Sequence, residues 1–154
     1  MPEIKQHIAS ICSSLPAGVT LICVSKYQSE QAISEAYQSG ERDFGESHVQ
    51  ELVAKHEHLP KDIRWHFIGH LQTNKVKYIV PFIHLIQSVD SWHLLEVINA
   101  EAAKVGRVID VLLEVHVAKE ESKTGFDPIS LSAFPPVASC LYSNELCSRY
   151  RWWS

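Results

Sequence analysis

Lys26 is the residue whose type and place in the chain best suit covalent chemistry. It follows an apolar run that ends in Val24-Ser25-Lys26, and such a run predicts a strand. Side chains alternate along a strand, so if Thr20, Ile22 and Val24 face a barrel interior, Lys26 does too, at the strand's carboxyl end. A lysine that is partly desolvated there can form an imine with an aldehyde. Position alone leaves open a surface lysine whose aliphatic stem lies along the protein.

Two histidines, His66 and His70, are spaced four residues apart. On a helix this spacing would suit a metal, but on the strand expected at 64–68 it places both rings on one face. No glutamate stands at the position of an H-E-x-x-H motif, and the sequence identifies no third ligand. We therefore expect both histidines to line the barrel, and we expect no metal site.

Other catalytic signatures are absent from the sequence. Gly45 and Gly69 each follow an expected strand, but neither belongs to a G-x-G-x-x-G or Walker motif. No G-x-S-x-G motif occurs, and no cysteine has a recognisable activating context. The acidic residues are expected to be solvated charges rather than an acid–base pair, among them Glu46, Glu51, Glu120 and Glu121.

Five short apolar runs would position these residues, and each predicts a strand. They start at residues 19, 42, 64, 84 and 108. Helical patterns separate them at 29–38, 47–56, 74–80 and 91–105, and a further helix is expected at about 2–13. Ser29 and Ser91 suit helix N-caps, and Gly40 suits a left-handed residue after a helix. This alternation indicates parallel strands joined by right-handed crossovers.

The fifth run distinguishes between the possible parallel folds. The spacing of roughly 22 residues invites a leucine-rich repeat, but the leucine ladder of that repeat is absent. One face of the run carries Val111, Leu113, Val115 and Val117, and the other carries Asp110, Leu112, Glu114 and His116. A central strand of an open doubly wound sheet is apolar on both faces, whereas a strand facing a barrel's active site is not. We therefore expect an α/β fold, a partial TIM (β/α)8 barrel of about five parallel strands with an N-terminal helix.

Composition limits the function further. The 154 residues are 45% hydrophobic and 21% charged, with a formal net charge of −4, which is typical of a single globular domain. The slight acidity argues against nucleic-acid binding, and no apolar run approaches the roughly 20 residues of a membrane span. The N-terminus lacks a secretion signal and the four cysteines lack metal or disulfide spacing, so we expect a cytoplasmic protein.

Five sequence blocks occur in order along the first 128 residues. They are V-S-K at 24–26, F-G-E-S-H-V-Q-E at 44–51, W-H-F-I-G-H-L-Q-T-N-K at 65–75, I-Q-S-V-D-S at 86–91 and A-K-E-E-S-K-T-G-F at 118–126. Together they resemble the pyridoxal phosphate homeostasis proteins of the YggS/PROSC group. The resemblance implies a barrel like the N-terminal domain of alanine racemase, with pyridoxal 5′-phosphate (PLP) held as a Schiff base. The cofactor-binding residues that we predict are Lys26, Ser47, His70, Ser88 and His116.

The chain departs from this family at two site positions. The family's G-E-N motif reads Gly45-Glu46-Ser47 here, and His116 stands where the family has asparagine. Either change would weaken the orientation of the PLP ring without removing the imine.

The C-terminal segment departs further. Residues 129–154 match nothing that we recognise in the family and have no clean helical or strand period, so we expect a PLP-barrel part at 1–128 and an irregular non-family tail at 129–154. The tail suggests a truncation or an out-of-frame product, with a novel module as the alternative. The family's phosphate-binding loops would follow residue 126, so we expect weak PLP retention.

The resemblance implies a function in intracellular PLP homeostasis, without enzymatic turnover. The implied partners are PLP itself and PLP-dependent apoenzymes, but neither nucleic acid nor a membrane, and we expect a monomer. Two alternatives are a PLP-dependent amino-acid racemase and an inactive fragment that binds no ligand.

Overall fold

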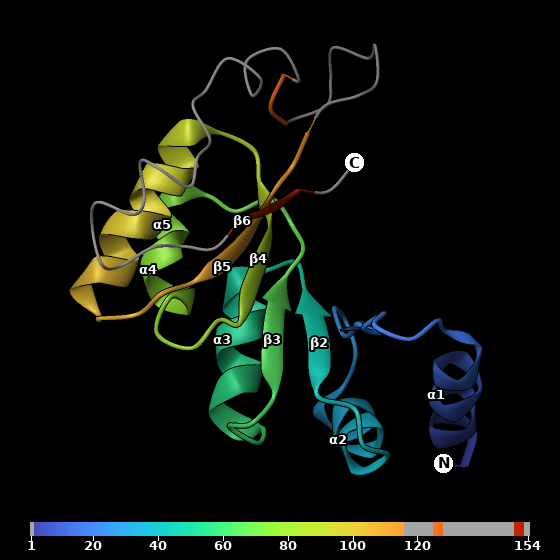
Figure 1. Ribbon diagram of the computed structural model, residues 1–154. Coiled ribbons are helices and arrows are strands. Elements are labelled where there is room, and N and C mark those ends of the chain that lie inside the picture. The colour runs from blue at the N-terminus through green and yellow to red at the C-terminus, as the bar shows by residue number, and fades with distance from the viewer. Residues whose placement is uncertain (1, 116–124, 128–149, 153–154) are drawn as a thin grey trace.

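One parallel sheet organises the chain, and the computed structural model describes residues 2–115, 125–127 and 150–152 (Figure 1). The strands are β1 (Cys23–Val24), β2 (Asp43–Glu46), β3 (Arg64–Phe67), β4 (Leu85–Val89), β5 (Asp110–Leu113) and β6 (Tyr150–Trp152). The helices are α1 (Pro2–Ser14), α2 (Glu30–Gln38), α3 (Val49–His58), the 3-10 turn η1 (Thr73–Lys75), α4 (Val76–Ile79) and α5 (Trp92–Lys104). None of the helices within these ranges is long and apolar enough to cross a membrane.

The order of the strands identifies the type of fold. Neighbours in the sheet follow the sequence from β1 to β6, and every neighbouring pair is parallel. A doubly wound sheet reverses its strand order at a switch point, whereas a (β/α)8 barrel adds each strand beside the previous one. The described strands therefore follow the order of a barrel, as the sequence predicts. β6 is a short strand within residues 129–154, for which the sequence predicts an irregular tail.

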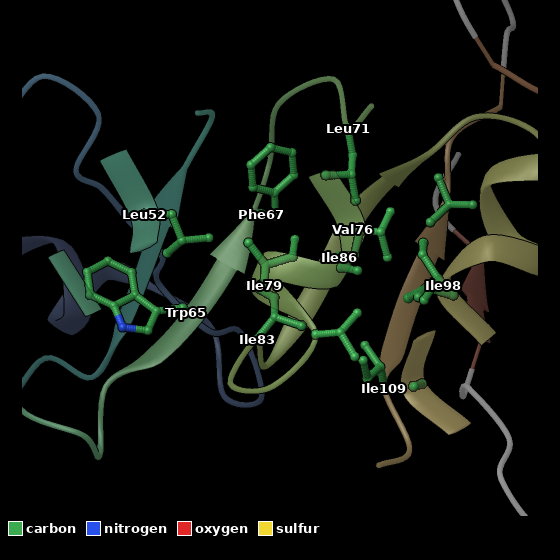
Figure 2. Packing of buried hydrophobic residues seen from close by; sticks show 14 of the residues in the cluster. Leu52, Trp65, Phe67, Leu71, Val76, Ile79, Ile83, Ile86, Ile98 and Ile109 are labelled. Carbon is green, nitrogen blue, oxygen red and sulfur yellow. The ribbon is translucent and has the colours of Figure 1, made fainter. Parts of the chain in front are cut away.

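Helices on one side of the sheet build the hydrophobic core. α3, α4 and α5 lie along the same side of β3, β4 and β5 (Figure 1). The strands contribute Trp65, Phe67 and Ile86 to this core, and α3 and α5 contribute Leu52 and Ile98 (Figure 2). Each of these side chains is at most 1% exposed. Burying one large apolar side chain stabilises a fold by about 1.5–3 kcal/mol, so this layer holds the sheet and helices together.

The alternation predicted for the fifth strand is confirmed. Val111 and Leu113 are buried in the core, whereas Asp110 and Leu112 on the other face are only half-buried. That other face is the one that a barrel turns inward. His116 and Val117 lie outside the described residues.

The first strand is shorter than the run at 19–24 that predicts it. Only Cys23 and Val24 pair with the neighbouring strand, opposite Phe44 and Gly45. β2 begins at Asp43, so residues 19–21 extend beyond the start of their neighbour and have no strand residue opposite them.

Local sequence signals set most helix limits. The Oγ atoms of Ser29 and Ser91 accept hydrogen bonds from backbone N–H groups three residues on, at 3.2 and 3.1 Å, which confirms both predicted N-caps. Gly40 has a φ of +108° just beyond α2, a left-handed conformation that favours glycine. α3 begins at Val49 rather than at 47, because Ser47 still belongs to the loop after β2.

Candidate functional site

An open cavity of about 580 Å³ lies at the carboxyl ends of β1, β4 and β5. Its lining residues are Ile22, Val24, Ile68, Gln87, Ser88, Leu113, Glu114 and Val115. Apolar side chains form most of the wall, and an amide, a hydroxyl and a carboxylate add polar groups. Small-molecule sites typically have this composition and a volume of about 300–1,000 Å³. The carboxyl end of the strands is also where barrel enzymes place their active sites.

Lys26 lies in the turn that follows β1, at this same end of the sheet. Ile22 and Val24, the residues before it on the expected interior face, both line the cavity. The alternation predicted for this run is therefore confirmed for Ile22 and Val24, whereas Thr20 does not line this cavity. The side chain of Lys26 is exposed, so the lysine belongs to the solvent-facing edge of the site rather than to its wall.

The backbone before Lys26 is fixed by buried polar groups. Ser25 donates its backbone N–H to the carbonyl of Gly45 at 2.9 Å, and its hydroxyl donates to Glu46 Oε1 at 2.6 Å. The carbonyl of Ser25 accepts a hydrogen bond from Lys55 Nζ at 2.7 Å. Ser25 is 2% exposed, so these bonds hold it in a dry setting where they are strong.

The backbone after Lys26 is held as well. Tyr27 donates its N–H to Glu51 Oε1 at 2.7 Å and has a φ of +62°, a left-handed conformation that is rare for a residue other than glycine. Such a conformation costs of order 1–3 kcal/mol and persists only where its surroundings impose it. The turn that carries Lys26 is therefore constrained from both sides.

A buried ion cluster supports this turn. Lys55 Nζ lies 2.6 Å from Glu46 Oε1 and 2.6 Å from Glu51 Oε1. Glu46 is fully buried and Lys55 is 5% exposed. Burial alone would raise the pKa of Glu51, but hydrogen bonds from Lys55 and from the Tyr27 N–H outweigh it, so this pKa lies below its ordinary value.

The prediction that Glu46 is a solvated charge is wrong. Glu46 alternates with Gly45 along β2, so it points away from the barrel interior and under α3, where Lys55 meets it. The spacing of Glu51 and Lys55, four residues apart on one helix, is the sequence signal for part of this cluster. The burial of Glu46 depends on how α3 packs against β2, which spacing alone does not reveal.

Two of the predicted cofactor residues, Ser47 and Ser88, meet at Gly69. A Cβ added to Gly69 would overlap the backbone carbonyl of Ser47 and lie 2.7 Å from its Cα, so only glycine allows these two loops to approach so closely. Ser88 Oγ donates to the carbonyl of Gly69. Ser88 lines the cavity, and Ser47 therefore lies one loop away from it.

The structure places the predicted histidines His66 and His70 in different environments. His66 is 3% exposed, with Nε2 2.9 Å from Asp43 Oδ1 and Nδ1 3.1 Å from the amide of Gln87. His70 is an exposed residue whose Nδ1 lies 3.2 Å from Asp90 Oδ2. The two rings thus do not share one lining surface, and His116 lies outside the described residues.

Comparisons with known proteins bear on this site. The family described as alanine racemase, N-terminal domain, matches residues 1–135. A pyridoxal phosphate homeostasis protein of Aquifex aeolicus is 39% identical over 135 residues, which are 85% of this chain and 59% of that protein. The chain therefore spans little more than half the length of that curated relative.

Solved structures give the same result. PipY of Synechococcus elongatus PCC7942, solved without PLP, has a TM-score of 0.85 and 38% identity, covering 95% of this chain and 67% of PipY. Its PLP-bound structure has a TM-score of 0.79 and 39% identity, covering 93% and 65%. Alanine racemase of E. faecalis has a TM-score of 0.66 at 15% identity, covering 97% of this chain and 39% of the racemase, a likeness of fold alone. The resemblance seen in the motifs is confirmed: the chain is similar to proteins named pyridoxal phosphate homeostasis protein and to PipY. The chain belongs to the alanine racemase N-terminal domain family.

Proposed function

We propose that this chain binds PLP in the cavity, that the amine of Lys26 would condense with the PLP aldehyde and release water, and that the protein serves PLP homeostasis. The observation that carries the proposal is the constrained turn of Lys26 at the edge of a cavity on the carboxyl ends of the strands. The PLP-bound PipY structure, at 39% identity, supports PLP as the ligand.

The described residues fit such a ligand. PLP supplies an aldehyde that condenses with a primary amine and a ring that withdraws electrons from the carbon attached to that nitrogen. Val24 and Ile68 offer apolar surface to a ring, and Ser88 and Gln87 offer hydrogen-bonding groups beside it. Ser25, Glu46 and Lys55 hold the backbone beside Lys26, so the lysine side chain starts from a fixed backbone position.

The other residues that we predict to contact PLP are supported by the structure to different degrees. Ser88 lies in the cavity wall, and Ser47 lies against Gly69 beside it. His70 would have to turn from its contact with Asp90 to reach a ligand. His116 stays a prediction from the family resemblance.

Homeostasis is proposed in preference to amino-acid racemisation. The relative from Aquifex is named a homeostasis protein, and the likeness to alanine racemase shows the fold alone. Racemisation requires a second catalytic base. The family resemblance implies that alanine racemase takes this base from its other domain. We propose a cytoplasmic monomer that supplies PLP to apoenzymes without turnover of its own. Protein loaded with PLP should leave L-alanine optically unchanged, and conversion to the D-enantiomer would favour the racemase.

Reductive trapping tests the assignment of Lys26. Protein mixed with PLP should gain a visible absorbance band, and borohydride should then fix the label on the peptide that contains Lys26. Lys26→Ala should lose both signals, whereas Lys77→Ala, which removes an exposed lysine of α4, should keep them. A label spread evenly over surface lysines and unchanged in Lys26→Ala would contradict the proposal.

A further inference from the structure

We propose that Asp43, His66 and His84 form a binding site for a divalent transition metal, at the opposite end of the strands from the cavity. Each of the three offers one ligand atom, and these atoms all lie within 4.8 Å of one another. Asp43 is the first residue of β2 and His84 directly precedes β4, so the cluster lies towards the amino ends of the strands. None of the three residues lines the cavity that we propose for PLP.

The strand register brings the three residues together. Gly45 pairs with His66, and His66 pairs with Leu85. Asp43 lies two residues before Gly45 on the same face of β2, which makes it a diagonal neighbour of His66. The N–H of His84 donates to the carbonyl of Trp65 at 2.9 Å, and its ring centroid lies 5.3 Å from that of His66. Three separate strand segments thus converge, which the spacing of His66 and His70 cannot reveal.

His66 points its Nε2 at Asp43, and a turn of the Gln87 amide would make that nitrogen a metal ligand. Its Nε2 faces Asp43 Oδ1 at 2.9 Å, about the separation of two neighbouring ligands on one ion. Its Nδ1 lies 3.1 Å from the amide nitrogen of Gln87, Nε2, which donates to it. Metal binding would turn this amide over, so that its oxygen accepts the Nδ1–H and the Nε2 lone pair is free for the metal. Metal-binding histidines commonly hold their other ring N–H in a hydrogen bond of this kind.

The ionisation of the cluster also suits a cation. Burial lowers the pKa of His66, although the hydrogen bond with Asp43 acts in the other direction, so the ring is in its neutral ligand form near neutral pH. Burial alone would raise the pKa of Asp43, but hydrogen bonds from Arg64 and His66 hold it below its ordinary value. His84 is exposed and gives the site an opening to solvent.

Arg64 competes with the metal. Its Nε donates to Asp43 Oδ1 at 2.8 Å and its Nη2 donates to Asp43 Oδ2. The Arg64 side chain is 48% exposed, so the guanidinium is able to turn into solvent while the ion takes its place beside the carboxylate. The metal-free cluster is thus closed by Arg64, and binding exchanges one cationic partner of Asp43 for another.

The ligand set selects the class of metal. Two imidazoles and one carboxylate suit Zn²⁺ and related transition ions, whereas Mg²⁺ and Ca²⁺ prefer oxygen ligands. Three protein ligands leave further positions for water. We expect the site to bind Zn²⁺, and Co²⁺ serves as its spectroscopic substitute.

The test is a Zn²⁺ titration by calorimetry on the tag-free 154-residue chain at neutral pH. We expect one Zn²⁺ per chain and, with Co²⁺, visible bands of nitrogen ligation. Loss of a residue that only orients a ligand typically weakens a metal site about 10–100-fold. His84→Ala removes a ligand itself, so it should weaken binding by at least about tenfold. Arg64→Met should act in the opposite direction and tighten binding, because it removes the competing cation.

Two controls separate this site from incidental binding. His70→Ala removes a histidine of another His–Asp pair, at 3.2 Å from Asp90, and should leave the affinity unchanged. Cys23→Ser should also leave it unchanged, because burial raises the pKa of that thiol to about 11 and keeps it protonated. Circular dichroism checks that each variant is folded. The proposal is overturned by no saturable Zn²⁺ binding, by His84→Ala binding like the parent, by weaker binding in Arg64→Met, or by a loss in either control.

Discussion

The single residue Lys55 is a cation between the carboxylates of Glu46 and Glu51. Among substitutions in the candidate site, its loss should lower the free energy of unfolding most. Lys55→Met leaves Glu46 buried without its charge partner, and breaking a buried pair on one side typically costs about 3–5 kcal/mol. We expect the free energy of unfolding, measured by urea denaturation, to fall by about that amount. Lys104→Met breaks a 2.6 Å pair with Glu101 near the surface of α5 and should cost no more than about 1 kcal/mol.

Removing both charges distinguishes the cost of an isolated buried charge from the cost of changed packing. The double variant Glu46→Gln with Lys55→Met should recover much of the lost stability, because no isolated charge stays buried. If Lys55→Met destabilises no more than Lys104→Met, the buried cluster does not hold the turn of Lys26 as inferred above.

His66 gives the stability a pH dependence of defined sign. Burial lowers its pKa in the folded protein below the ordinary 6.5, so the unfolded chain takes up a proton first as the pH falls. Between the two pKa values the unfolded state binds more protons than the folded state. The free energy of unfolding therefore decreases as the pH is lowered. The groups that face the ring are Asp43, Arg64 and His84.

Denaturation at a series of pH values measures this effect. From pH 6.5 downward, His66→Gln should lose less stability than the parent, whatever its stability at neutral pH. The matched control His93→Gln, at an exposed position of α5, should keep the parent's slope. Parallel curves for His66→Gln and the parent would show that His66 is not the group responsible.

At the scale of elements, the loops after β2 and β3 depend on Gly69. A Cβ at this position would overlap the backbone of Ser47, whereas a Cβ at Gly45 would meet Ile68 Cδ1 at 3.1 Å and Ile22 Cγ2 at 3.2 Å. Side-chain tips are able to shift and backbone is not, so we expect Gly69→Ala to destabilise by about 1–3 kcal/mol and Gly45→Ala by less. Thermal melts compare the two variants, and the reverse order would contradict the close approach of the loops.

The elements themselves follow closely from the sequence, but their contacts do not. Apolar runs and serine caps predict β2 to β5 and the starts of α2 and α5, because these signals are local. β1 is shortened by the limits of its neighbour, which is a property of pairing. The Glu46–Lys55 pair and the approach of Asp43 to His84 both require a strand or helix from elsewhere in the chain. Sequence reasoning therefore locates Lys26 and misses the groups that support it.

At the scale of the whole molecule, the inward face of the sheet carries two different chemical environments. The carboxyl end holds the cavity, and the amino end holds the Asp43 cluster. Gln87 belongs to both, because it lines the cavity and contacts His66 at 3.1 Å. Metal binding that reorients the Gln87 amide would therefore alter a polar group of the proposed PLP site.

The part of the barrel that residues 1–154 contain determines how strongly this polypeptide should retain PLP. Barrels commonly bind phosphate at loops after strands 7 and 8, the described strands number six, and the chain spans 59% of the Aquifex relative. A hydrogen bond to a charged group contributes about 1.5–3 kcal/mol. Loss of two such bonds would weaken binding by about a hundredfold or more. We expect residues 1–154 to release PLP on gel filtration while the longer Aquifex protein retains it, and equal retention by a compact monomer of this chain would contradict that expectation.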